Sequence, residues 1–214
     1  KFSGQYMFPE SHAYAFGITA YQMAWLKHHY PLEFFVAIFN QQPMGFYNLE
    51  TLKEDAKRHG INVLNPDINE SEVKCKAKDD AVLLGLMNVS GIGASRAKVI
   101  VEARVRDERS FSSLSDVIYR TGLQREALEN LVMAGTFDTL IPDRRAALWQ
   151  VGLLYRPIGV QQALPIPVGH DMIALPALSD WEVMLGEYRT MGLYPRGHFM
   201  AHMRPRLDPK VLNC

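Results

Sequence analysis

Two glycines separated by one isoleucine constrain this chain more than any other feature of its sequence. An apolar stretch from Leu86 leads into Gly91-Ile92-Gly93, and residues 94–104 follow with alanine, valine and basic side chains at helical spacing. Glycines let the backbone turn tightly and come close to a phosphate, while the isoleucine between them points inward. The pattern predicts a helix-hairpin-helix, in which backbone amides at the start of the second helix face an anion.

The predicted ligand of this hairpin is the phosphate backbone of DNA. Basic side chains at the start of the second helix would add charge beside the amides and hold DNA without reading its sequence. The residues predicted to bind DNA here are Ser90, Gly91, Ile92, Gly93, Ala94, Arg96 and Lys98. The alternative is a plain tight turn between two helices.

A weaker copy of the same pattern follows about thirty residues later. Residues 111–120 predict a helix, Thr121-Gly122-Leu123-Gln124 a turn, and residues 125–134 the next helix. Two such units in tandem predict a four-helix DNA-binding subdomain, and the second adds Thr121, Gly122, Leu123 and Arg125 to the predicted contacts. Residues 89–145 carry nine basic and eight acidic side chains. Binding would therefore depend on where the basic side chains lie rather than on the net charge of the region.

The whole chain predicts a mainly α fold with a small β insertion. Ser11 is expected to cap an aromatic-rich helix over residues 12–30, whose apolar surface on all sides predicts burial against several neighbours. Further helices are expected at 32–39, 49–59 and 181–190, the last capped by Ser179 or Asp180, and short strands at 61–64, 73–77 and 82–86. The predicted divisions are the helical segment 1–60, a β-containing connector 61–88, the tandem hairpins 89–155, and a linker, helix and basic tail 156–214.

Composition and missing motifs exclude several classes of protein. The 214 residues hold 23 basic and 23 acidic side chains, and no apolar run reaches the roughly 18 residues of a membrane span. Two cysteines, Cys75 and Cys214, cannot build a disulfide framework or a cysteine zinc site. His198 and His202 are four residues apart but lack a third ligand, so no metal site is predicted. Close carboxylate pairs on a strand are missing as well, and no catalytic centre is visible.

Blocks along the chain resemble the bacterial C-family DNA polymerases, the alpha subunits of DNA polymerase III and their relatives. These blocks, in the family's order, are Phe8–Ala13, Tyr21–Lys27, Tyr30–Phe34, Asn65–Asn69, Ser90–Gly93 and Ala134–Asp138. Other blocks are similar to the error-prone, damage-tolerant branch rather than the replicative one. They are Pro9-Glu10, Gln42–Tyr47, Leu148-Trp149 and Met191–His198.

The resemblance implies a DNA-directed DNA polymerase that acts in error-prone synthesis during DNA repair. Such an enzyme adds deoxynucleotides to a primer end and uses Mg²⁺ held by three palm aspartates. The palm precedes this region in the family, so the chain is expected to be a fragment with the end of the fingers and the tandem hairpins, inactive alone and binding no cofactor. Ser11, His12 and Lys27 are implied to lie near the incoming dNTP. The implied location is the bacterial cytoplasm, with primer-template DNA as partner.

Three further interpretations stay open. Replicative relatives carry a sliding-clamp motif after the hairpins, and the comparable residues here, Gln161, Gln162, Leu164 and Ile166, lack its terminal Leu-Phe or Met-Phe pair. This stretch is therefore either a clamp contact or a linker. A helix-hairpin-helix glycosylase would place a catalytic aspartate near Asp116. A scaffold for protein partners would use the Pro-rich residues 157–176 and the tail 189–210, which has five basic residues and one acidic residue.

Overall fold

The N-terminal part of the chain is a series of three helices. The computed structural model describes residues 9–45, 47–155 and 173–208. Helices α1 (Glu10–His29) and α2 (Pro31–Asn40) meet at Tyr30, and α3 (Leu49–Arg58) follows, capped by the Asn48 side chain. The predicted N-cap at Ser11 is wrong, because Pro9 occupies that position and the helix already begins at Glu10.

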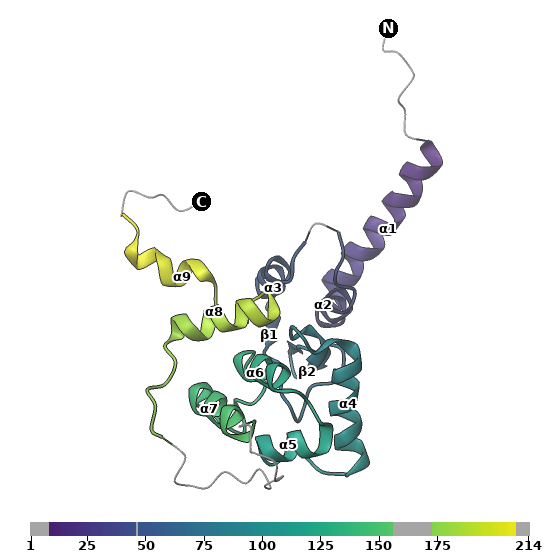
Figure 1. Ribbon diagram of the computed structural model, residues 1–214. Helices are drawn as coiled ribbons and strands as arrows, with labels where there is room; N and C mark the ends of the chain where they lie inside the picture. Colours follow the sequence, from purple (N-terminus) through teal and green to yellow (C-terminus); the bar gives the residue numbers. More distant parts are fainter. Residues whose placement is uncertain (1–8, 46, 156–172, 209–214) are drawn as a thin grey trace.

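The predicted burial of the first helix is also wrong. None of the residues of α1 is buried, and Tyr14 and Tyr21 are each 71% exposed. In Figure 1, α1 projects away from the rest of the described chain. An apolar surface on every side of a helix needs neighbours on every side, and the described elements cover little of α1 beyond its end at α2.

A three-stranded sheet follows, which confirms the expected β insertion. Its order is β1 (Asn62–Leu64), β3 (Ala81–Leu83) and β2 (Lys76–Lys78), with β3 parallel to β1 and antiparallel to β2. The second strand begins three residues later than predicted. The carbonyl of Val73 instead accepts a hydrogen bond from the amide of Met87, so this part of the chain pairs with the segment that enters the first hairpin.

The hairpin region consists of short helices around one apolar core. A 3-10 turn, η1 (Leu86–Asn88), precedes α4 (Gly93–Arg106), and α5 (Leu114–Thr121), α6 (Arg125–Met133) and α7 (Arg144–Leu154) follow. The core is continuous from α2 through the sheet and hairpin helices to Leu193. The fold class is therefore as predicted, mainly α with a small sheet. The division of the chain into domains stays a prediction.

The last described helices return to the N-terminal half (Figure 1). Ser179 and Glu182 form a reciprocal capping box at the start of α8 (Asp180–Met191), and α9 (Phe199–Met203) and η3 (Arg204–Arg206) follow. Across the described ranges, no helix combines the length and apolar character that a membrane span requires.

Lys53 of α3 is fully buried and ties this helix to the chain after α8. Its ammonium group forms ion pairs with Glu50 at 2.8 Å and Glu54 at 2.6 Å. It also donates hydrogen bonds to the carbonyl oxygens of Tyr194, at 3.1 Å, and Gly197. Burial of a lysine is tolerated when its charge and all its donors are satisfied, as they are here. The Lys53 cluster therefore joins two segments that are far apart in the sequence.

Candidate nucleic-acid interface

The first hairpin has the backbone that its glycines predict. Gly91 has φ +77° and Gly93 has φ +58°, conformations that residues with a Cβ rarely adopt. Ile92 between them is only 2% exposed, so its side chain anchors the turn in the core while the glycines stay at the surface. The turn leads directly into α4, whose first residue is Gly93.

Two other helices hold this turn in place. The amide of Ser90 donates to the carbonyl of Thr190 on α8 at 2.7 Å, and Asn130 Nδ2 on α6 donates to the carbonyl of Ser90 at 3.0 Å. A Cβ on Gly91 would lie 3.1 Å from Asn130 Nδ2, so the amide group packs closely against the turn. Sequence reasoning missed Asn130 and Thr190, because nothing local links residues forty or more positions apart.

The start of α4 presents positive charge at the surface. No side chain of the described residues caps this end of the helix, and Gly93, Ala94 and Ser95 are exposed. The guanidinium of Arg96 donates to the carbonyl of Gly91, which places it over the turn. Lys98 is exposed and lies 3.6 Å from Glu102, a contact that solvent screens. Backbone amides and two cations therefore share one exposed surface that suits an anion.

The second hairpin repeats the arrangement with one glycine. Gly122 has φ +64° and ends α5, and Leu123 is buried as Ile92 is in the first hairpin. Thr121 Oγ1 donates to the carbonyl of Val117 at 2.6 Å, so its hydroxyl proton is used within α5. Arg125 begins α6 and forms an exposed ion pair with Glu129 at 2.7 Å.

Helix α6 connects the two turns directly. Arg125, its first residue, follows the second turn, and Asn130 touches the first turn. Five residues of helix correspond to a rise of about 7.5 Å. The structure thus brings the two predicted hairpins together on either side of a short stretch of α6.

The residues predicted to approach a nucleotide lie apart from the hairpins. Ser11 and His12 are in the exposed first turn of α1, which projects away from α4 and α6 in Figure 1. Lys27 forms an ion pair with Asp55 of α3 at 2.6 Å and lies over the Phe35 ring at 5.5 Å. Lys27 therefore connects α1 to its neighbours.

Part of the sequence prediction falls where the structure gives no description. The four residues of the clamp stretch, Gln161, Gln162, Leu164 and Ile166, lie outside the described residues, as does most of the Pro-rich segment. Both clamp binding and the scaffold function therefore stay predictions.

Asp116 serves as an ion-pair partner. Its carboxylate accepts two hydrogen bonds from Arg109, at 3.0 and 2.8 Å, one from Arg120 at 3.3 Å, and one from the amide of Ser112 at 3.1 Å. Burial acts to raise the pKa of Asp116, but the Ser112 hydrogen bond and the two arginines outweigh it and lower the pKa. A carboxylate fixed in this way is a poor general base, which disfavours the glycosylase alternative.

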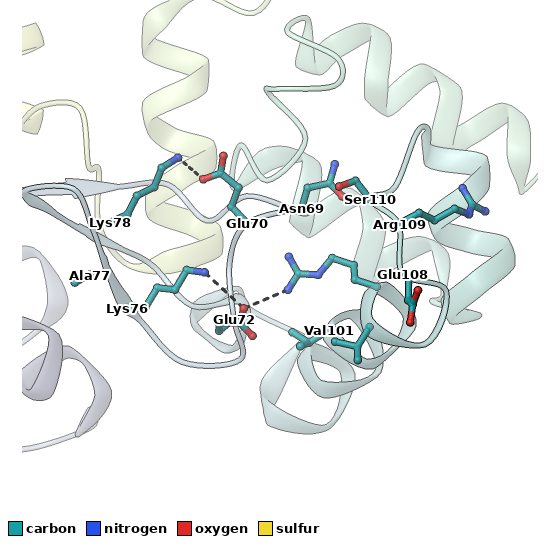
Figure 2. A pocket seen from close by; sticks show the side chains of 12 residues that line it. Asn69, Glu70, Glu72, Lys76, Ala77, Lys78, Val101, Glu108, Arg109 and Ser110 are labelled. Carbon is teal, nitrogen blue, oxygen red and sulfur yellow. Dashed lines mark hydrogen bonds and ion pairs between the residues drawn. The ribbon is translucent and has the colours of Figure 1, made fainter.

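A surface hollow lies beside α4 (Figure 2). Glu70 forms an ion pair with Lys78, and Glu72 with Lys76 at 3.5 Å and Arg104 at 4.0 Å. These five charged side chains of the hollow are thus paired with one another. Within the described ranges, no group of three or more histidine, cysteine, aspartate or glutamate residues could hold a metal ion.

The block Ala134–Asp138 has a structural role. Asp138 accepts hydrogen bonds from Arg144 at 2.8 and 2.7 Å, and Arg144 also donates to Glu187 of α8 at 2.7 Å. Glu187 is fully buried and receives a further hydrogen bond from Asn65 at 2.8 Å. Burial raises the pKa of Glu187, although Arg144 opposes the shift. This Arg144 network joins α7 and α8, and α8 in turn supports the first hairpin.

Comparisons with known proteins agree with the geometry of the hairpins. A family described as "Helix-hairpin-helix motif" matches residues 60–147. The error-prone DNA polymerase of Dechloromonas aromatica is 39% identical over 207 residues, which cover 95% of this chain and 20% of that protein. Those of Bordetella parapertussis and Burkholderia pseudomallei are each 40% identical, over 95% and 98% of this chain and 20% of each relative.

The chain thus spans about one fifth of the length of the curated relatives that it matches. The residues that match the helix-hairpin-helix family contain both hairpins and helix α6, which joins them. Over almost its whole length, the chain is similar to a segment of the error-prone DNA polymerases, and its residues 60–147 match the helix-hairpin-helix family, which confirms the resemblance that its motifs predicted.

Proposed function

We propose that this chain binds the backbone of duplex DNA through its two hairpins, as part of an error-prone DNA polymerase. The observation that carries the proposal is the pair of exposed turns at Gly91–Gly93 and Gly122, joined by α6. Each turn precedes a helix whose first amides carry partial positive charge. Contacts of this kind go to phosphates and carry no sequence information.

The activity of the whole polymerase is part of the same proposal. The relatives are named error-prone DNA polymerases. From this name we propose template-directed addition of dNTPs to a primer during damage-tolerant synthesis, and we place this activity in the bacterial cytoplasm. Ser11 and His12 are proposed to approach the incoming nucleotide from α1. We assign the catalytic Mg²⁺ to the palm of the whole polymerase, as the resemblance to this family implies.

The test is anisotropy of a labelled primer-template duplex titrated with the 214-residue chain across a salt series. Binding should weaken as salt rises, because phosphate contacts release counterions. The variant Gly91→Ala/Gly93→Ala should bind at least tenfold more weakly to every sequence. Each Cβ costs roughly 1–2 kcal/mol in the left-handed conformation, and a turn that changes shape to relieve this strain no longer presents its amides to a phosphate. Arg96→Ala should reduce the salt slope by about one contact.

Gly60→Ala is the matched control for these substitutions. Gly60 has φ +79° and open space around it, so the alanine imposes similar backbone strain at a turn between α3 and β1. Its affinity for DNA should match that of the wild type. Strong dependence of affinity on base sequence, or equal loss of binding in Gly60→Ala, would contradict the proposal.

A further inference from the structure

A groove runs between α6, α7 and α8, and of the predicted duplex contacts only Arg125 lines it. It encloses about 880 Å³, which is within the range of ligand-binding clefts. Large apolar side chains from the three helices line it. They are Met133, Leu148, Trp149, Leu153 and Leu185.

This groove reaches both hairpin turns. Arg125, which follows the second turn, lines it, and so do Asn130 and Thr190, which hold Ser90 of the first turn. The groove therefore lies next to the two turns across which the duplex is proposed to lie.

The rim of the groove is rich in arginine. Arg125 pairs with Glu129 at 2.7 Å and Arg145 with Glu182 at 2.8 Å, both near the surface. Exposed ion pairs contribute about 0–1 kcal/mol, so a phosphate can replace the carboxylate at little cost. Arg189 also lines the groove, is exposed, and has no ion pair with any described residue.

We propose that this groove binds unpaired nucleotides of a DNA strand that leaves the duplex held by the hairpins. Bases would stack on Trp149 and pack against the leucines, while phosphates would meet Arg189 and Arg125. An apolar floor with exposed arginines on its rim is the combination that single strands need, because each base has an apolar face and each linkage a negative charge. The inference rests on the proposed function for the position of the duplex.

Continuity with the turns favours a DNA strand over a peptide. An acidic amphipathic helix would also fit an apolar groove with arginines on its rim. Three of the lining residues, however, form or support the hairpin turns, so the groove opens where a strand would arrive.

The test uses the fluorescence of Trp149. The chain has three tryptophans, and Trp25→Phe/Trp181→Phe leaves Trp149 as the only one. Titration with a thymidine oligonucleotide of about fifteen residues should quench this signal, because bases stack on the indole. In anisotropy, Trp149→Leu should weaken binding of the labelled oligonucleotide about 5- to 150-fold. Arg189→Ala should reduce the salt slope by about 0.7.

Two further variants separate this inference from the proposed function. Gly91→Ala/Gly93→Ala should lose duplex binding while the oligonucleotide still quenches Trp149. Trp181→Leu, a change outside the groove lining, should leave the affinity for the oligonucleotide unaltered.

Absence of quenching, or equal affinity of Trp149→Leu and the wild type for the oligonucleotide, would overturn the inference even if duplex binding is intact. Quenching by a glutamate-rich helical peptide but not by the oligonucleotide would also overturn it and assign the groove to a protein partner.

Discussion

The variant Arg144→Met removes the buried guanidinium that joins α7 to α8. Asp138 would keep its 2.7 Å contact with Arg196, but Glu187 would retain only Asn65 and a more distant Arg196 at 3.9 Å. Removal of one partner of a buried ion pair costs about 3–5 kcal/mol, because the other charge stays buried without compensation. That loss is a large part of the roughly 5–15 kcal/mol that stabilises a typical protein.

Urea unfolding followed by circular dichroism, together with a thermal melt, measures this loss. For a chain of this size the melting temperature should fall by about 6–20 °C. The double variant Arg144→Met/Glu187→Leu should regain most of the lost stability, because an apolar pair can replace a buried ion pair at little cost.

The pH dependence provides a second measurement of the same network. The pKa of Glu187 is raised on folding. Below the ordinary glutamate range the carboxyl is protonated in both the folded and the unfolded chain, and the shift costs no stability. Above that range the cost grows as pH rises to the raised value. Without Arg144 this cost grows. The loss of unfolding free energy caused by Arg144→Met should therefore be larger near pH 7 than near pH 4.

If Arg144→Met loses less than about 1 kcal/mol of unfolding free energy at pH 7, this account of the Arg144 network is wrong. The same holds if the double variant is no more stable than the single one, because the cost would then not come from the uncompensated Glu187 carboxylate.

Three other predictions concern single positions. Asn130→Ala should raise the rate of amide exchange in the first hairpin turn and weaken duplex binding several-fold, with the melting temperature nearly unchanged; exchange by NMR checks this. Gly135→Ala should destabilise the fold by more than Gly122→Ala in urea, because both have positive φ but only at Gly135 would the Cβ collide with a buried guanidinium. Asp107 should titrate by NMR at about 2, because its Arg106 hydrogen bond lowers its pKa, and the stability it provides above about pH 3.8 should disappear as pH falls through 2.

Local patterns predicted the hairpins well, because their causes are local. Positive φ at Gly91 and Gly93 follows from a turn that only glycine adopts easily. The cap at Ser179, one of the two caps expected for the last helix, follows from a serine directly before that helix. Ile92 is buried, as expected for a side chain that anchors the turn between two glycines. Each of these features depends on residues within one or two helical turns.

Long-range contacts could not be predicted in the same way. Asn130 supports Ser90 across forty residues, and Arg144 meets Glu187 across forty-three. A polar residue on a helix gives no sign of which distant carbonyl or charge it will meet. The prediction that α1 is buried failed for a related reason. An apolar pattern indicates that a helix needs neighbours but does not supply them.

The Lys53 cluster has a consequence for synthesis of the chain. The carbonyls of Tyr194 and Gly197 that accept its hydrogen bonds lie 141 and 144 residues downstream. At about 5–20 residues per second, a ribosome needs roughly 7–28 seconds to deliver them after Lys53 has been added. Throughout that interval the lysine has only Glu50 and Glu54 as neighbouring charges, and full burial would leave donors unsatisfied. We therefore expect helix α3 to reach its final position only after the C-terminal segment emerges, so that the two halves complete their folding together.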